Sequence, residues 1–315
     1  MIRNGKLLCA AAALLLLAGC GTPAQQVSEI PAQVVSQADE TPSPVVEIDS
    51  ISVETPGAPA ETLPPTPTPV ITPEPTAAPT PEPTPEPITA ARLDSGEFDA
   101  YFDDALLIGD SLTDILSGYV RKQRQTNESF LGAAKVLGTT SMSVKIASTN
   151  KASSNGISFR YRGHAVSITE CINACEAKKV FIMLGVNDIG TRSWDTVQEY
   201  YATLIDVILE NCPDTEIIMQ GVLPVTSRYT SEHKLKIDRW NSFNEILAGI
   251  CAEHGVAFLD FSKQFMDEKG YLDKKLSSDN LFHLNETGEA IWIRALRLYA
   301  ARQMSPDAAV LLPEA

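Results

Sequence analysis

Residues 105–114 read ALLIGDSLTD, a short apolar run that ends in Gly109 and gives way to polar residues. A run of this kind, bounded by turn-forming residues, predicts a buried β-strand. Three similar runs follow, at 179–184, 216–220 and 256–260. Helical patterns lie at 112–122, 168–178, 193–211, 232–254 and 286–302. Buried strands that alternate with amphipathic helices predict an α/β fold, a three-layer α/β/α sandwich with a central, mostly parallel sheet.

The polar residues after the first strand include a candidate nucleophile, Ser111. Functional groups of such sheets lie at the carboxyl ends of the strands, and Ser111 stands on the turn from strand to helix. There its hydroxyl has the free N–H groups of a helix N-terminus nearby, which can receive an oxyanion. Ser111 and Asp114 also have the form of a capping box, so the serine can serve as a helix cap, with or without a chemical role.

A second polar cluster, Gly185-Val186-Asn187-Asp188, follows the strand predicted at 179–184. Glycine, asparagine and aspartate are common in turns, so a plain turn accounts for these residue types. An asparagine amide at a strand end can also donate a hydrogen bond to an oxyanion without introducing a titrating group. Asn187 is therefore a candidate oxyanion donor.

One of the four histidines is a candidate general base. His164 lies in a predicted turn, and His233 and His254 lie near the two ends of the helix predicted at 232–254. His283 lies in a loop before the last helix, for which Asn285 is a natural N-cap. A serine hydroxyl needs a base within hydrogen-bond reach at neutral pH, and imidazole supplies one.

Together these segments resemble the GDSL, or SGNH, hydrolase family, over about residues 105–302. The resemblance rests on Gly-Asp-Ser-Leu at 109–112, Gly-x-Asn-Asp at 185–188 and the loop with His283. It implies that Ser111 is the nucleophile, that His283 is the base, and that the Ser111 N–H and the Asn187 side chain donate to the oxyanion. It implies no cofactor, and the sequence shows no metal-binding motif.

Two family positions are less clearly marked in this chain. The family's second motif supplies a glycine N–H to the oxyanion hole; Gly138 is the preferred match and Gly132 the alternative. The last motif, Asp-x-x-His, places the acid three residues before the base, where this chain has Asn280. We expect Asp279, four residues before His283, to orient the imidazole, because a carboxylate both fixes the tautomer and stabilises the imidazolium.

The N-terminus has the features of an export signal. Arg3 and Lys6 precede an apolar stretch at 7–18, which is too short to span a bilayer and predicts a signal peptide over 1–19. Residues 17–20, Leu-Ala-Gly-Cys, resemble the lipobox of bacterial lipoproteins. That resemblance implies acylation of Cys20 and a lipid anchor, whereas an ordinary signal peptide that contains a cysteine is the alternative.

A Pro/Thr/Glu-rich segment, residues 20–92, separates the predicted anchor from the predicted catalytic domain at 93–304 and tail at 305–315. It holds 17 of the chain's 21 prolines and ten acidic residues, and its sole basic residue is Arg92. Such a composition predicts a disordered, extended stalk, with a docking ligand for a partner as the alternative. The net charge of −15, without a basic cluster, argues against a nucleic-acid partner.

These expectations describe a monomeric, lipid-anchored serine esterase on the extracytoplasmic face of a cell membrane. O-acetyl esters on carbohydrate or cell-wall polymer are the expected substrates. Short-chain acyl esters, lysophospholipids or acyl transfer to a sugar hydroxyl are alternatives, as is a non-catalytic glycan-binding protein of the same fold. Cys171, Cys175, Cys212 and Cys251 are compatible with two disulfides or with buried free thiols.

Overall fold

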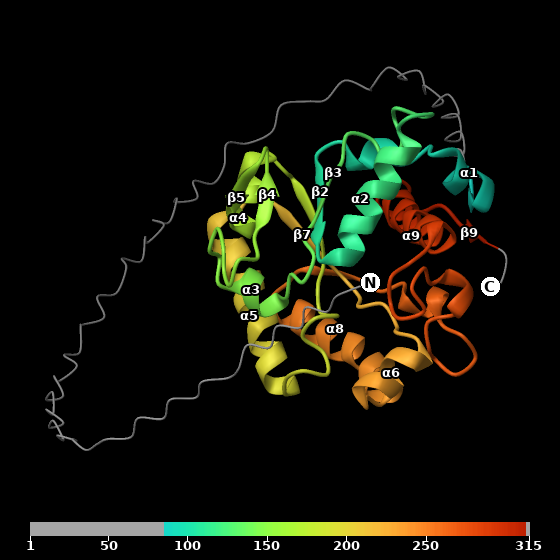
Figure 1. Cartoon of the computed structure of the whole chain (residues 1–315). Helices are drawn as coiled ribbons and strands as arrows, with labels where there is room; N and C mark the ends of the chain where they lie inside the picture. Colours follow the sequence, from blue (N-terminus) through green and yellow to red (C-terminus); the bar gives the residue numbers. More distant parts are fainter. Residues whose placement is uncertain (1–84, 313–315) are drawn as a thin grey trace, which may run out of the picture. The chain divides into compact units, whose positions relative to one another are not determined.

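The computed structural model describes residues 85–312 (Figure 1). The predicted signal peptide, the predicted lipidation site Cys20 and most of the predicted stalk lie outside the described residues. Within them, no helix has the length and apolar character that crossing a membrane requires.

The centre of the domain is a five-stranded sheet in which every neighbouring pair is parallel. Its order is β3-β2-β6-β7-β8. The strands are β2 (Ala105–Gly109), β3 (Lys135–Gly138), β6 (Lys179–Met183), β7 (Glu216–Gln220) and β8 (Ala257–Leu259). The predicted α/β fold with a parallel sheet is therefore confirmed. All five strands run the same way, so their carboxyl ends meet at one edge of the sheet.

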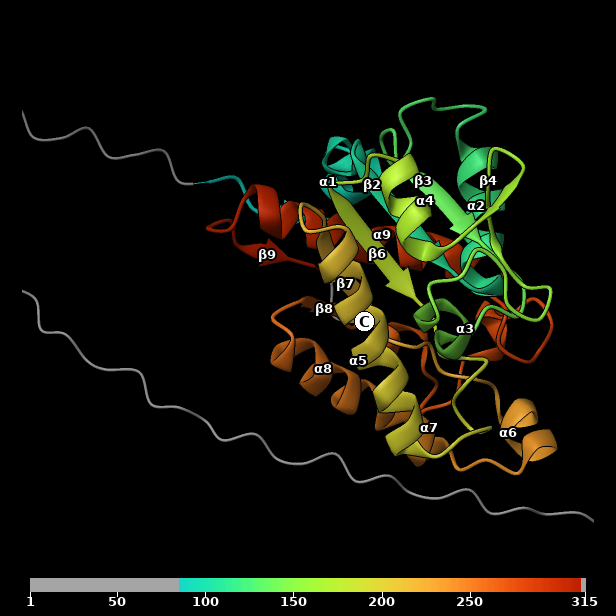
Figure 2. The same cartoon turned by 90° about the vertical axis from the view of Figure 1, so that its left-hand side faces the viewer.

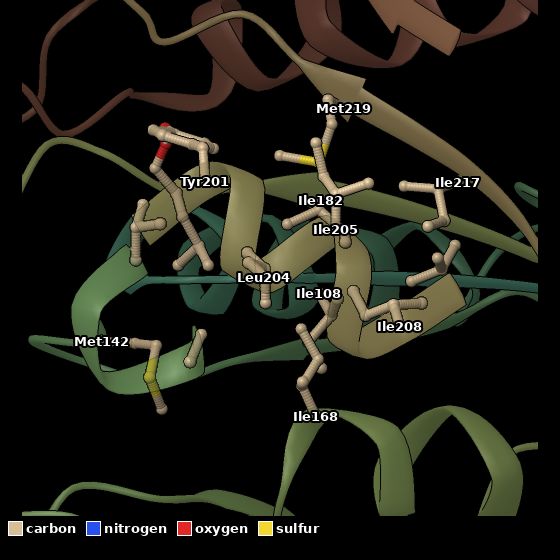
Figure 3. Packing of buried hydrophobic residues seen from close by; sticks show 14 of the residues in the cluster. Ile108, Met142, Ile168, Ile182, Tyr201, Leu204, Ile205, Ile208, Ile217 and Met219 are labelled. Carbon is tan, nitrogen blue, oxygen red and sulfur yellow. The ribbon is translucent and has the colours of Figure 1, made fainter. Parts of the chain in front are cut away.

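Helices cover both faces of this sheet, and in Figure 1 they lie to the two sides of the labelled strands. One face is covered by α1 (Ala90–Ser95), α2 (Ser111–Gln123) and α9 (Glu286–Met304), and the other by α3 (Val144–Ser148), α4 (Ile168–Ala174), α5 (Trp194–Asn211) and α8 (Phe243–Glu253). Alternation along β2 divides the two cores: Leu107 packs with the first set, and Leu106 and Ile108 pack with the second. Figure 3 shows Ile108 gathered with Ile182 and with the α5 side chains.

The folded domain extends beyond both predicted boundaries. Strand β1 (Ile88–Thr89) pairs in parallel with β9 (Val310–Leu311), and Ile88 is fully buried. Residues 88–92 therefore belong to the folded domain and not to the stalk, and the predicted tail contributes a strand. Two-residue strands carry no periodicity, so the sequence pattern could not reveal them.

The single helix predicted at 232–254 is wrong. The structure has three helices in this region: α6 (Ser227–His233), α7 (Ile237–Asn241) and α8. Helix α6 ends at Lys234, whose backbone is left-handed, and the next side chain, Leu235, packs against Gly190. The Trp240 indole N–H donates to the Leu223 carbonyl, which anchors α7. Tertiary contacts thus interrupt the helix that the continuous apolar pattern at 232–254 predicts.

The remaining elements are short. A β-hairpin is formed by β4 (Phe159–Tyr161) and β5 (His164–Val166), and single 3-10 turns lie at η1 (Asp99–Phe102), η2 (Ser262–Phe265) and η3 (Lys274–Leu276). The four cysteines of the domain are buried free thiols.

Candidate active site

Ser111 is the first residue of α2, directly after the carboxyl end of β2. The preceding residue, Asp110, is the N-cap, and its Oδ1 accepts the Leu112 N–H at 2.9 Å. The prediction that Ser111 caps this helix in a capping box with Asp114 is therefore wrong, and the N-cap is the residue before it, Asp110. Because Asp110 caps the helix, the Ser111 hydroxyl is left for another partner.

That partner is His283. Its Nε2 lies 2.9 Å from Ser111 Oγ, and its Nδ1 lies 2.7 Å from Asp279 Oδ2. The side chains of His283 and Asp279 are 27% and 30% exposed, so the array is open to a substrate. The structure thus brings the predicted base and acid, which stand 172 and 168 residues after Ser111 in the chain, together with the predicted nucleophile.

The loop that carries the acid and the base accommodates one residue more than the motif Asp-x-x-His. Asn280 has a left-handed backbone, with φ of 58°. Asp279 Oδ1 accepts the backbone N–H groups of Leu281 at 2.7 Å, Phe282 at 3.2 Å and His283 at 3.3 Å. The loop therefore curls around the Asp279 carboxylate, and Asp279 rather than Asn280 reaches the imidazole. Partial burial opposes ionisation of Asp279, but the Leu281 N–H and the imidazole outweigh it and lower its pKa.

Asn187 follows the carboxyl end of β6, the strand that pairs with β2. Its Nδ2 donates to the Met142 carbonyl at 2.8 Å, which fixes the side chain and leaves one of its two N–H donors for a ligand. The next residue, Asp188, is fully buried and accepts the Val144 N–H at 2.7 Å. These two contacts tie the Asn187 turn to the N-terminus of α3.

Asp110 and Asp188 are both fully buried beside the nucleophile and the candidate oxyanion donor. Burial, with the Asp188 charge as a further cause, raises the pKa of Asp110 to about 7. Burial also raises the pKa of Asp188, against the opposing effect of its backbone hydrogen bonds. The sequence alone indicated no catalytic or binding role for either aspartate. Their signal in the sequence was their place in the Gly-Asp-Ser-Leu and Gly-x-Asn-Asp motifs, each beside a candidate site residue.

Gly138 lies at the same sheet edge, in register with Gly109. The N–H of the next residue, Thr139, donates to Gly109 O, and N–H groups alternate along a strand, so the Gly138 N–H points away from β2. A Cβ on Gly138 would lie 1.9 Å from Asp114 N, so close packing of β3 on α2 requires glycine here. The prediction that Gly138 donates to the oxyanion is therefore corrected. Gly132 precedes β3, at the opposite end of the strand.

A left-handed residue that the sequence did not mark, Ser141, lies in the turn after β3, with φ of 62°. This turn leads directly into Met142, whose carbonyl holds Asn187. The turn at 139–142 is thus tied to the candidate oxyanion donor. Among residues 85–312, no cluster of three or more His, Cys, Asp or Glu side chains is arranged to hold a metal ion.

The parallel sheet covered by helices on both faces, with a serine at the start of the helix after β2, has the α/β/α architecture of the GDSL hydrolases. Residues 107–291 match the profile of the GDSL-like Lipase/Acylhydrolase family, and the chain belongs to that family. At the level of the family, its activity is the hydrolysis of ester bonds.

Solved structures of two other proteins are similar to this chain. A GDSL-like lipase from Bacteroides thetaiotaomicron has a TM-score of 0.50 and 14% identity over 68% of this chain and 98% of its own. An acetyl xylan esterase from Geobacillus stearothermophilus has a TM-score of 0.44 and 20% identity over 62% of this chain and 93% of its own. At these identities the likeness concerns the fold alone. A search of curated proteins finds no match to this chain.

Proposed function

We propose that this protein is a serine esterase of the extracytoplasmic membrane face that removes acyl groups, above all O-acetyl groups, from carbohydrate or cell-wall polymer. The observation that carries the proposal is the hydrogen-bonded order Ser111, His283, Asp279 at the carboxyl edge of the sheet. Membership of an acylhydrolase family supports the ester as the bond that is cleaved.

In the first half of the reaction, Ser111 Oγ forms a bond to the ester carbonyl carbon while its proton passes to His283 Nε2. The carbonyl oxygen takes up the electron pair and becomes an oxyanion. Asp279 Oδ2 accepts the Nδ1–H of His283 and stabilises the imidazolium. When the carbon–oxygen bond of the ester breaks, His283 returns the proton to the leaving alcohol and the acyl group stays on Ser111.

The oxyanion needs donors that are already in place when the charge develops. The N–H of Ser111 belongs to the free first turn of α2, and the second N–H of Asn187 is unused by Met142. A backbone N–H of the turn at 139–142 takes the place that the sequence assigned to Gly138. This assignment is supported by the link from that turn to Asn187.

In the second half, water attacks the acyl carbon, His283 again accepts and returns a proton, and Ser111 is restored. A sugar hydroxyl in place of water makes the same site an acyltransferase. The half-buried ring of Phe282 lies beside the base, with its centroid 4.2 Å from that of His283. The half-buried ring of Tyr229 packs against Phe282, at 5.4 Å between centroids. An aromatic surface here suits the C–H face of a sugar ring.

The proposed location is supported by two sequence features outside the described residues, the predicted lipidation site at Cys20 and the Pro/Thr/Glu-rich segment predicted to be a stalk. An enzyme held in this way meets wall and capsular polymers before cytosolic metabolites.

The test is a comparison of substrates with the full mature chain in detergent. Acetate release from O-acetylated peptidoglycan and acetylated xylan is measured beside fatty-acid release from lysophosphatidylcholine, with Ser111→Ala as the blank. We expect acetate release from the acetylated polymers and little fatty-acid release from lysophosphatidylcholine. Preference for lysolipid contradicts the substrate class, and glycan binding without any turnover favours the non-catalytic alternative.

A further inference from the structure

The loop that carries the acid and the base is held from outside by α6. Three residues separate Asp279 from His283, and α6 lies at the end of the molecule toward which the β6 arrow points in Figure 2. The residue that links the two is Thr226, the N-cap of α6, which is fully buried.

Thr226 makes two hydrogen bonds to consecutive carbonyl groups of the loop. Its Oγ1 donates to Asn280 O at 2.8 Å, and its backbone N–H donates to Leu281 O at 2.8 Å. The same Oγ1 accepts the Tyr229 N–H at 3.3 Å and so caps α6. One buried hydroxyl thus forms hydrogen bonds both with the first turn of α6 and with the loop.

These contacts fall where the loop departs from the family motif. A left-handed backbone is unfavourable for a residue other than glycine and persists where the surroundings hold it. Asn280 has this conformation, and its carbonyl, like that of Leu281, is fixed on Thr226. The third intervening residue, Phe282, packs its ring edge-on against Tyr229 of α6. All three residues between acid and base are therefore held by α6.

We propose that Thr226 is a positioning residue, which holds the lengthened loop so that Asp279 stays within hydrogen-bond distance of His283 across three intervening residues instead of two. The inference rests on the proposed function in taking His283 as the base. Thr226 acts through the loop and touches no reacting atom.

The test must separate the loop contact from the helix cap. Thr226→Val removes both roles of the hydroxyl, and Thr226→Ser keeps both. Thr226→Asp keeps a good capping side chain, but an ionised carboxylate only accepts hydrogen bonds and has no hydrogen to donate to Asn280 O. The matched control is Ser193→Ala, because Ser193 caps α5 through the Thr196 N–H at the same distance, 3.3 Å, and no contact to the loop is found for it.

With the full chain and p-nitrophenyl acetate, we expect Thr226→Val and Thr226→Asp to lower kcat by about 10- to 100-fold with KM nearly unchanged, because a misplaced catalytic group costs up to about 10²-fold. Thr226→Ser should restore most of the rate, and Ser193→Ala should leave it unchanged. Full activity of Thr226→Asp overturns the proposal, since the cap alone would then explain Thr226.

A second readout does not depend on turnover. A proton held between His283 Nδ1 and Asp279 gives a far-downfield 1H NMR signal, which wild type, Thr226→Ser and Ser193→Ala should show and which Thr226→Val and Thr226→Asp should lose. If the wild-type chain has the signal but hydrolyses no ester, the proposed function fails and the positioning role is still tested. An unchanged signal in folded Thr226→Asp contradicts that role, and this comparison still tests the proposal if Thr226→Val does not fold.

Discussion

His283 Nδ1 lies 2.7 Å from Asp279 Oδ2, although the acid stands four residues before the base and the family motif places it three before. The left-handed turn at Asn280 takes up the extra residue. From the sequence, the acid of the motif is either lost or moved by one residue. In the structure it is moved by one residue, to Asp279.

This relationship predicts opposite outcomes for two neighbouring substitutions. Asp279→Asn should lower kcat by roughly 10³- to 10⁴-fold, because the imidazole loses the carboxylate that fixes its tautomer. Asn280→Gly should keep most of the activity, since glycine adopts a positive φ readily. Initial rates on p-nitrophenyl acetate check both. If kcat falls more in Asn280→Gly than in Asp279→Asn, the assignment of Asp279 as the acid is wrong.

Asn187→Ala should lower kcat by about 10²- to 10³-fold with a small change in KM, because an oxyanion donor acts mainly in the transition state. Asn211→Ala, at an exposed asparagine whose side chain donates only to the Val207 carbonyl of its own helix, is the control and should be silent. Steady-state kinetics of the two variants give the comparison. A rise in KM alone would assign Asn187 to ground-state binding.

Gly138→Ala should destabilise the fold, because its Cβ would lie 1.9 Å from Asp114 N and overpacking costs about 1–3 kcal/mol or more. Thermal unfolding measures the loss. Gly249→Ala is the matched control, since a Cβ there meets open space on α8. If Gly138→Ala unfolds like wild type but loses its activity, the packing explanation of this glycine is wrong.

Glu289 gives a pH-dependent prediction outside the active site. It is 2% exposed, and burial raises its pKa to about 8. Between its ordinary value of 4.5 and about 8, the unfolded chain has lost this proton while the folded chain keeps it. The contribution of Glu289 to stability therefore falls as pH rises through this window and stays constant above it.

Glu289→Gln should remove this pH dependence. The Tm of the variant relative to wild type should increase from pH 5 to pH 8 and then level off. Glu286→Gln, at an exposed glutamate of the same helix, should show no such trend. Calorimetry over this range makes the measurement, and a constant Tm difference for Glu289→Gln would contradict the assignment.

Much of the fold was predictable from sequence because strands such as β2 and β6 are buried on both faces, and each is followed by polar residues at its carboxyl end. That pattern also placed Ser111 and Asn187 at one sheet edge. It could not give the direction of the Gly138 N–H, which the pairing of β3 with β2 sets. Nor could it give the break between α6 and α8, where Leu235 and Trp240 find partners distant in sequence.

Covalent labelling of the full chain with a fluorophosphonate, read by intact mass and peptide mapping, tests the central claim most directly. We expect one adduct on the peptide that contains Ser111, none in Ser111→Ala, and much slower labelling in His283→Ala. A folded wild-type chain that takes no label, or takes it on another residue, contradicts the assignment of Ser111 as the nucleophile.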